Sequence, residues 1–296
     1  MDNIKSHITS TEILQKIKLM TISALVSDDI LIGILVLKGG NALNLAYDIT
    51  SRGSIDIDFS MEKDFTKQEK IRIQNKLSYL LNQEFAKENY VVFDIKLSDR
   101  PEKIKKEIKT FWGGYLLEFK VISSEIFNEY KNDEEALRRR ALPIHKDNST
   151  KFTVDISKYE YIAKKRLRDI EGTIVSVYSP EMLAIEKLRA LCQQNQDYKN
   201  IILSFTPKSR ARDFYDIYNI STSFSIDFDS AENIELCHHI FAAKRVPLSY
   251  IPRIEEQREF HRQSWESVKD TVDPKERLKE FDFYFDYTLN LFKQLF

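Results

Sequence analysis

Two short apolar runs near the N-terminus constrain the fold of this chain more than any other feature. The run from Ile30 to Leu37 is rich in β-branched residues and is followed closely by Gly39-Gly40, two of only 7 glycines in 296 residues. A short, β-branched, apolar run of this kind predicts a buried strand that ends in a turn. Residues 41–47 then favour a short helix, and the alternation over 55–61 predicts a second strand. The expected unit is strand, turn, helix, turn, strand.

The second of these strands carries a pair of carboxylates. Asp56 and Asp58 are separated by one residue, so on a strand both side chains project from the same face. Two carboxylates this close repel each other unless a cation lies between them, and Mg²⁺ prefers oxygen ligands. Gly39-Gly40 before a helix would let backbone N–H groups approach a phosphate. Together these features favour a phosphoryl- or nucleotidyl-transfer site, although an isolated Asp-x-Asp is common and indicates little by itself.

The rest of the chain divides into a mixed first part and a helical second part. Before Ser179, the patterns predict helices over 11–29, 66–89 and 126–142, and strands over 90–97, 114–123, 151–157 and 173–178. Pro180 directly after Ser179 is a favourable helix start, and nearly the whole remainder has helical character. We therefore expect two domains, an α/β domain over 1–179 and a helical domain over 180–296.

Composition limits the class of protein. The net charge of −1 argues against a polycation, so nucleic-acid binding would need a local basic surface. The two cysteines, Cys192 and Cys237, fit a reducing compartment better than a disulfide-framed secreted domain. The longest apolar run is one strand long, whereas a spanning helix needs about 20 residues, and the charged N-terminus lacks the apolar segment of a signal peptide. We expect a soluble cytoplasmic protein without a membrane partner. The sequence has no Walker A pattern and no G-x-G-x-x-G, which argues against a P-loop NTPase and a Rossmann dehydrogenase.

Three stretches together resemble a known family. The first is KGGNALNLAYDITSRGSIDIDF from Lys38 to Phe59, and the others are PEMLAIEKLRAL at 180–191 and RARDFYD at 210–216. In order and spacing they resemble the DNA polymerase β-like nucleotidyltransferase superfamily and, more narrowly, the AbiEii/AbiGii toxin family. That family shows a Gly-Gly turn, then Arg-x-Ser-x-Asp-x-Asp-Phe, a later lysine motif and a closing Arg-Asp-x-x-Asp motif. The chain departs from it at Asn41, where the family usually has Ser or Thr; an amide can also donate to a phosphate oxygen.

The resemblance implies a fold and a set of site residues. The fold would be α+β, with a polymerase β-like domain (a mixed sheet flanked by helices) followed by a mainly helical C-terminal domain. Asp56 and Asp58 would bind Mg²⁺ or Mn²⁺. The triphosphate of a bound NTP would be held by Lys38, Gly39, Gly40, Asn41, Arg52, Ser54 and Lys187. The helical part would also contribute Asp213 to catalysis.

A third carboxylate on a neighbouring strand is common in the superfamily, and two residues qualify. Asp155, one acid inside the apolar run 152–157, is the preferred candidate for a third metal ligand or for the base that deprotonates the attacking hydroxyl. Glu118 is the competing candidate. A strand-edge aspartate that faces water is an equally consistent interpretation of Asp155.

The predicted roles in the helical part also have alternatives. Lys187 lies on an otherwise apolar helix face, so it either contacts the triphosphate or extends to solvent. Asp213 and Asp216 are three residues apart on one helix and share a face. One of them would position Lys187 or Arg212, or both belong to an ion-pair network on the helix.

The resemblance implies an enzyme that transfers a nucleotidyl group from an NTP to an acceptor hydroxyl. By family analogy the acceptor would be a tRNA 3′ end or another RNA, and the enzyme would be the toxin of a toxin–antitoxin or abortive-infection system in antiviral defence, with a cognate antitoxin. The alternatives are a small-molecule or protein acceptor, and a degenerate fold that binds nucleotide without turnover. Two basic runs, Arg138–Arg140 and Lys164–Arg168, would meet an RNA backbone or are solvated surface charges.

Overall fold

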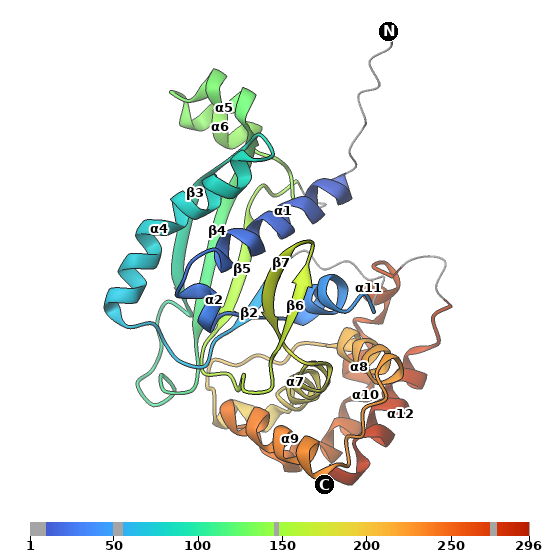
Figure 1. The fold of residues 1–296 in the computed structure, drawn as a ribbon. Coiled ribbons are helices and arrows are strands. Elements are labelled where there is room, and N and C mark those ends of the chain that lie inside the picture. Colours follow the sequence, from blue (N-terminus) through green and yellow to red (C-terminus); the bar gives the residue numbers. More distant parts are fainter. Residues whose placement is uncertain (1–9, 50–55, 145–147, 273–276, 296) are drawn as a thin grey trace.

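The computed structural model describes residues 10–49, 56–144, 148–272 and 277–295. Within these residues the centre is a mixed sheet of seven strands in the order β3-β4-β5-β2-β1-β7-β6 (Figure 1). The strands are β1 (Val36–Lys38), β2 (Ile57–Ser60), β3 (Tyr90–Arg100), β4 (Gly114–Ser123), β5 (Phe152–Ser157), β6 (Arg166–Ile170) and β7 (Thr173–Val177). β2 pairs with β1 antiparallel and with β5 in parallel, so the Gly-Gly and Asp-x-Asp strands lie in the middle of the sheet.

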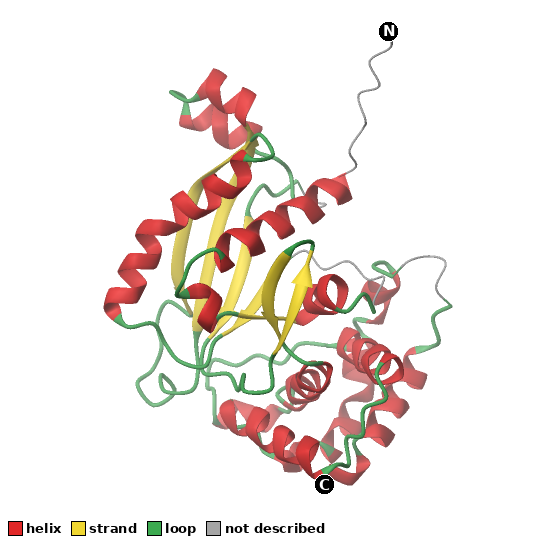
Figure 2. Cartoon of the chain, viewed as in Figure 1, coloured by secondary structure: helices red, strands yellow, loops and turns green. Residues whose placement is uncertain are grey.

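Helices cover one face of the sheet and gather at both of its ends. Those before the last strand are α1 (Ser10–Val26), α2 (Leu31–Ile34), α3 (Gly39–Asn41), the π-helical η1 (Ala42–Ala46), α4 (Lys67–Ala86), α5 (Ser124–Tyr130) and α6 (Glu134–Arg140). Those after it are α7 (Pro180–Cys192), η2 (Gln196–Asn200), α8 (Ala211–Ser223), α9 (Ala231–Ala243), η3 (Leu248–Tyr250), η4 (Pro252–Gln257), α10 (Arg258–Arg262), α11 (Trp265–Lys269), α12 (Phe281–Leu291) and η5 (Lys293–Leu295). α1 and α4 pack together on one face, α5 and α6 lie at the upper end, and α7, α8, α9 and α12 gather at the lower end (Figure 2).

The predicted strand over residues 30–37 is wrong for most of its length. Leu31–Ile34 form the helical turn α2, and only the end of the run reaches β1. The cause is local: Asp28 Oδ1 accepts hydrogen bonds from the backbone N–H groups of Ile30 (2.9 Å) and Leu31 (3.1 Å). A carboxylate that satisfies the free N–H groups at a helix start favours the turn over an extended chain.

Two other predictions differ from the structure. The predicted helix over 126–142 is two helices, α5 and α6, because the Asp133 side chain accepts a hydrogen bond from the N–H of Ala136 and so begins a new helix. Strand β6 was not predicted, since its arginines made the segment resemble a charged run. β6 is an edge strand, where charged side chains are commonly found. The other predicted helices and strands before Ser179 are present, within a few residues of their predicted ends.

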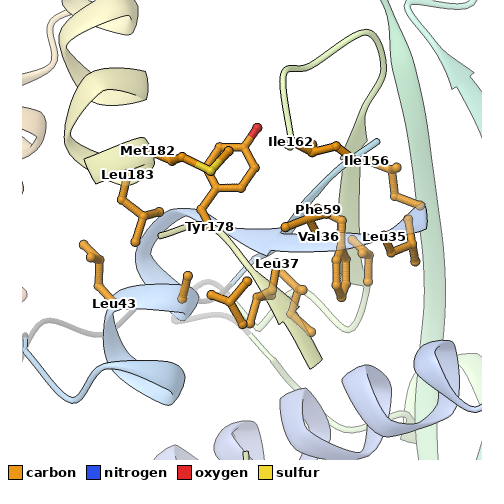
Figure 3. Close-up of a cluster of buried hydrophobic side chains, with 14 of the residues drawn as sticks. Leu35, Val36, Leu37, Leu43, Phe59, Ile156, Ile162, Tyr178, Met182 and Leu183 are labelled. Carbon is orange, nitrogen blue, oxygen red and sulfur yellow. The ribbon is translucent and has the colours of Figure 1, made fainter. Parts of the chain in front are cut away.

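One hydrophobic core joins the sheet to the helical part. Figure 3 shows the region where Leu37 on β1, Phe59 on β2 and Ile156 on β5 belong to the same buried cluster as Met182 and Leu183 on α7. Burying a side chain of this size contributes about 1.5–3 kcal/mol. This packing fixes the first turn of α7 beside the strands that carry the predicted site residues.

The predicted boundary at Ser179 coincides with a change in architecture. β7 is the last strand among the described residues, and the Ser179 side chain caps α7 by accepting a hydrogen bond from the N–H of Met182. Because the hydrophobic core continues across this point, the division into domains over 1–179 and 180–296 stays a prediction. Among the described helices, none combines the length and the apolar character that a membrane-spanning segment needs.

Candidate active site

A cleft of about 750 Å³ lies between the sheet and the helical part. This volume falls within the range of about 300–1,000 Å³ that is typical of small-molecule sites. The sheet side of the cleft is formed by β1, β2, β5 and the loop after β3, and the helical side by α7 and the loop after η2. Polar and aromatic residues that line it include Lys38, Asp58, Arg100, Trp112, Asp155, Glu160, Glu186, Arg189, Gln193, Lys208, Arg210 and Lys244.

Two predicted carboxylates lie side by side on the sheet wall of this cleft. Asp58 on β2 and Asp155 on β5 are direct partners in the parallel register, and Asp58 is also the antiparallel partner of Lys38 on β1. Glu118, the competing third acid, lies one strand further out on β4, where Lys151 Nζ binds its Oε1 at 3.0 Å. Glu118 is not among the residues that line the cleft. The structure therefore places Asp155, rather than Glu118, beside Asp58.

The electrostatics of Asp58 are unusual for an aspartate. Burial, together with the neighbouring carboxylates of Asp155, Glu186 and Asp56, raises the pKa of Asp58 to about 7, and the charge of Lys38 opposes this only in part. Like charges held in a partly buried site disfavour ionisation unless a cation is close. The Asp58 carboxylate is thus in a place where a further cation would stabilise its charged form.

Asp56 and Asp155 each have a specific hydrogen-bond donor. Thr153 Oγ1 donates to Asp56 Oδ1 at 2.7 Å, and Arg100 Nη1 donates to Asp155 Oδ1 at 2.6 Å. Burial raises the pKa of Asp155, and Arg100 acts against that rise. Within the described ranges, no three His, Cys, Asp or Glu side chains converge as a complete metal-binding group. Metal binding by Asp56, Asp58 and Asp155 therefore stays a prediction.

The Gly-Gly turn lies close to the carboxylate of Asp58. Gly39 has a left-handed backbone with φ of +69°, and a Cβ added there would lie 2.6 Å from Asp58 Oδ2. Gly40 and Asn41 are buried beside it. The Asn41 Nδ2 donates to the backbone oxygen of Asp56. This bond fixes the start of β2 and uses one of the two N–H donors of the amide. Donation from Asn41 to a phosphate stays a prediction.

The segment before β2 also carries Arg52 and Ser54, two predicted phosphate ligands. Both lie outside the described residues. Their contacts with a triphosphate stay predictions, as do those of the backbone N–H groups of the Gly-Gly turn.

A buried ion-pair network joins the sheet to α7. Lys38 Nζ lies 2.9 Å from Glu186 Oε1 and 3.7 Å from Glu160 Oε1, and Arg189 Nη1 donates to Glu160 Oε2 at 2.8 Å. Burial alone would lower the pKa of Lys38, but Glu186 and Glu160 raise it above its usual value, so the ammonium stays charged. Lys244 Nζ completes the network 3.4 Å from Glu160 Oε1. The network holds a cation, Lys38, beside the carboxylates of the sheet wall.

Lys187, which was predicted to contact the triphosphate, is not part of the cleft lining. Its ammonium is buried between Asp213 Oδ1 (3.2 Å) and Asp216 Oδ2 (2.6 Å). Arg210 also bonds Asp213; burial alone would raise the pKa of Asp213, but Arg210 and Lys187 together lower it to about 2. Of the two cations that bind Asp213, Arg210 lines the cleft and Lys187 does not. A direct contact of Lys187 with a nucleotide stays a prediction.

Seven charged residues in the described lining of the cleft had no predicted role: Arg100, Glu160, Glu186, Arg189, Lys208, Arg210 and Lys244. For Glu186 and Arg189 the sequence did hold a signal, because charged residues inside an apolar helix face are rarely buried without partners. Arg210 is the first residue of the motif RARDFYD at 210–216. Arg100 had no such signal, because it meets Asp155 only through the pairing of β3 with β4 and of β4 with β5.

Comparison of the sequence with known families gives one match. A family profile described as nucleotidyl transferase AbiEii toxin, type IV TA system, matches residues 23–287. A search of curated proteins found no match to the chain.

Comparison with solved structures agrees with the architecture. A candidate nucleotidyltransferase from H. pylori has a TM-score of 0.50 and 15% sequence identity, over 97% of this chain and 97% of that chain. The nucleotidyltransferase toxin MenT4 from Mycobacterium tuberculosis H37Rv has a TM-score of 0.49 and 12% identity, over 97% of this chain and 84% of that chain. At 15% identity the likeness to the H. pylori structure concerns the fold alone, and it confirms the expected α+β class with a mixed sheet flanked by helices.

Proposed function

The chain belongs to the nucleotidyl transferase AbiEii toxin family and is a nucleotidyltransferase, and we propose that its cleft uses Mg²⁺ or Mn²⁺ to transfer a nucleotidyl group from an NTP to the 3′ hydroxyl of a tRNA. The family comprises toxins of type IV toxin–antitoxin systems, so the proposal includes a cognate antitoxin. A tRNA that carries an extra 3′ nucleotide no longer presents the hydroxyl to which an amino acid is attached. Translation would then stop, as expected of a toxin.

The observation that carries this proposal is the pairing of Asp58 with Asp155 on two parallel strands at the wall of the cleft. A raised pKa in a cleft, together with a charged partner, is typical of functional carboxylates. The opposite wall supplies Arg210 and Lys208, and Lys38 is fixed beside the carboxylates. A cleft lined by both carboxylates and cations suits a metal-bound triphosphate.

The carboxylates fit a divalent cation by their chemistry. Asp58 and Asp155 offer hard oxygen donors from neighbouring strands at the wall of the cleft, and Asp56, directly before β2, adds a third carboxylate that Thr153 binds. Mg²⁺ usually binds one or two carboxylates and completes its shell with water and substrate phosphates. A site without three converging protein ligands is therefore consistent with an ion that binds together with the triphosphate. When bound, such an ion would neutralise charge on the phosphate oxygens of the transition state.

The chemical step in this proposal is an in-line displacement. The acceptor hydroxyl oxygen forms a bond to the α-phosphorus, the bond from that phosphorus to the bridging oxygen breaks, and pyrophosphate leaves with the electron pair. Asp155 accepts the hydroxyl proton, since burial raises its pKa and Arg100 holds its carboxylate in place. Lys38 and Arg210 provide positive charge near the phosphates.

A transfer assay tests the proposal. The protein is incubated with each α-labelled NTP, Mg²⁺ and total cellular RNA, beside the variants Asp58→Asn and Asp155→Asn. We expect label in the tRNA fraction with the wild type and a loss of about 100-fold or more in each variant, the scale seen when a transition-state contact is removed. Asp229→Asn is the matched control, because Asp229 is an exposed aspartate of the helical part.

The same assay separates the alternatives. Label that enters a small-molecule or protein fraction instead of RNA would keep the transfer chemistry and overturn the tRNA acceptor. Full transfer by Asp58→Asn would overturn the site. Removal of divalent ions with EDTA should abolish transfer, and added Mg²⁺ or Mn²⁺ should restore it; activity that persists in EDTA contradicts the proposed metal.

A further inference from the structure

The basic runs singled out in the sequence are already engaged within the protein. Arg138 bonds Asp94 and Glu134, Arg139 pairs with Glu135, and the Arg140 guanidinium lies 4.2 Å from the ring centroid of Tyr130. In the second run, Lys164 pairs with Glu232, Arg166 pairs with Glu181, and Arg168 lies 5.1 Å from the ring centroid of Tyr47. In both runs, therefore, most of the cations already have a partner within the protein.

The first run, Arg138–Arg140, also lies far from the cleft. β4 begins at Gly114, which lines the cleft, and ends at Ser123, after which α5 and α6 follow. Ten residues of strand at about 3.3 Å each separate the two ends by about 30 Å. Figure 1 shows α5 and α6 at the end of the sheet opposite α7. Arginines 138–140 cannot bind the part of an acceptor that enters the cleft.

A different set of cations borders the cleft. The loop from 101 to 110, PEKIKKEIKT, joins β3 to β4, and we call it the lysine loop. The residues flanking it, Arg100 and Trp112, line the cleft. Its four lysines are exposed, and among the described residues no ion pair engages any of them: Lys103, Lys105, Lys106 and Lys109. The loop has two glutamates against these four lysines, so it carries an excess of positive charge.

The lysine loop is anchored, so its lysines have a defined place. Ile108 packs against the hydrophobic core, and its carbonyl accepts hydrogen bonds from the N–H groups of Phe111 (3.2 Å) and Trp112 (2.9 Å). Phe111 is buried, and the Arg245 guanidinium lies 4.0 Å from its ring centroid. The apolar residues therefore face the protein while the lysines face solvent. This arrangement presents positive charge at the mouth of the cleft.

We propose that the lysine loop is the docking surface for the sugar-phosphate backbone of a nucleic-acid acceptor whose 3′ end enters the cleft. The inference rests on the proposed function, because it assumes an RNA acceptor. Surface cations bind phosphates by releasing condensed counterions. Trp112, half-buried where the chain returns to β4, adds an aromatic side chain to the cleft lining, and aromatic side chains together with cations are typical of single-strand binding sites.

Salt-dependent binding tests the docking surface. A fluorescein-labelled tRNA transcript is titrated with protein at increasing KCl concentrations, without NTP, and anisotropy is recorded. The variant that combines Lys103→Gln, Lys105→Gln, Lys106→Gln and Lys109→Gln should bind about 10-fold more weakly or worse, and the slope of log affinity against log salt should shrink by about 0.7–0.9 for each lost phosphate contact. The matched control combines Arg138→Gln, Arg139→Gln and Arg140→Gln, and should keep the wild-type affinity and slope.

The outcomes separate this inference from the proposed function. Wild-type affinity in the quadruple lysine variant, or an equal loss in the arginine control, overturns the docking surface even if transfer to tRNA is seen. Lysine-dependent binding without any transfer overturns the proposed acceptor and supports the lysine loop only as a surface that binds a nucleic-acid backbone. In the transfer assay the quadruple variant should raise KM for tRNA, with kcat and KM for the NTP unchanged. An unchanged thermal transition of the variant excludes misfolding as the cause.

Discussion

The α-carbon of Gly39 packs directly against the carboxylate of Asp58, so closely that an added Cβ would lie 2.6 Å from Asp58 Oδ2. Gly39→Ala would therefore force that carboxylate to turn, in addition to straining a backbone with φ of +69°. The strain alone costs about 1–2 kcal/mol. A displacement of about 1 Å at a reacting group can lower the rate about 100-fold. We predict a loss of transfer of that order, measured as kcat/KM, with only a modest loss of stability.

Gly172 provides the matched control for this prediction. Its φ is +84°, and a Cβ added there would meet nothing within 4 Å. Gly172→Ala should show a similar strain in urea unfolding and keep wild-type transfer. Equal activities of the two alanine variants would contradict the argument that Gly39 is needed for the position of Asp58.

Substitution of Lys187 distinguishes a structural role of its side chain from direct contact with the nucleotide. Its ammonium lies 3.2 Å from Asp213 Oδ1 and 2.6 Å from Asp216 Oδ2, and all three side chains are almost fully buried. Lys187→Met leaves buried carboxylates without this cation, which typically costs about 3–5 kcal/mol. We predict that urea unfolding shows a loss of this size. Lys87→Met, which removes an exposed partner of Glu84, should change stability little.

The contrary result would be equally informative. A Lys187→Met protein that is as stable as the wild type, yet needs about 10-fold more NTP for half-maximal rate, would show that the side chain leaves its aspartates and contacts the nucleotide. That outcome would restore the role that the family resemblance suggested.

The parts of the site that the sequence could predict are those set by local spacing. Alternation predicted Asp56 and Asp58 on one strand face; β2 begins at Ile57, so of the two only Asp58 lies on the strand and lines the cleft. An acid in an apolar run pointed to Asp155. The adjacency of Asp58 and Asp155 depends on the parallel register of β2 with β5, which no local pattern specifies. The bond from Arg100 to Asp155 depends on two further strand pairings.

The predicted strand over residues 30–37 failed because competing contacts decide the local structure. Residues 31–34 are apolar and include two isoleucines, as in a strand, but two hydrogen bonds to Asp28 favour a helical turn there. The pairing of Lys187 with Asp213 and Asp216, 26 and 29 residues further along the chain, agrees with the predicted role of these aspartates in positioning Lys187. That Lys187 does not line the cleft could not be predicted, because helix periodicity reports a face and not what covers it.

His261 gives a pH dependence of stability that can be measured. The ring is fully buried; its Nδ1 accepts the N–H of Arg210 at 3.1 Å, and its Nε2 lies 3.2 Å from Gln257 Oε1. Burial lowers the pKa of His261 from 6.5 to about 4, and Asp213 opposes this only in part. Between these values the unfolded chain binds a proton that the folded protein does not, so stability falls as the pH falls. From pH 7 to 5 the loss from this group should be about 2 kcal/mol.

The prediction for His261 is tested by how steeply the free energy of unfolding changes with pH, and not by its value at one pH. The free energy of unfolding is measured by urea at several pH values for the wild type, His261→Gln and the exposed His238→Gln. His261→Gln should flatten the fall toward acid pH, and His238→Gln should not. Asp58 also has a pKa near this window, about 7, but it is present in all three proteins and cancels in the comparison. Parallel curves for all three would contradict the assignment of a neutral, buried His261.

The two tryptophans allow occupancy of the cleft to be followed by fluorescence. Trp112 lines the cleft and is half-buried, whereas Trp265 is 3% exposed and packs against Phe281 and Tyr284. An NTP that enters the cleft with Mg²⁺ should displace water from the Trp112 ring and change its emission, because indole emission follows the polarity around the ring. Trp112→Phe should abolish the change, and Trp265→Phe should keep it. A change that survives in Trp112→Phe and vanishes in Trp265→Phe would place the response in the helical part and contradict binding in this cleft.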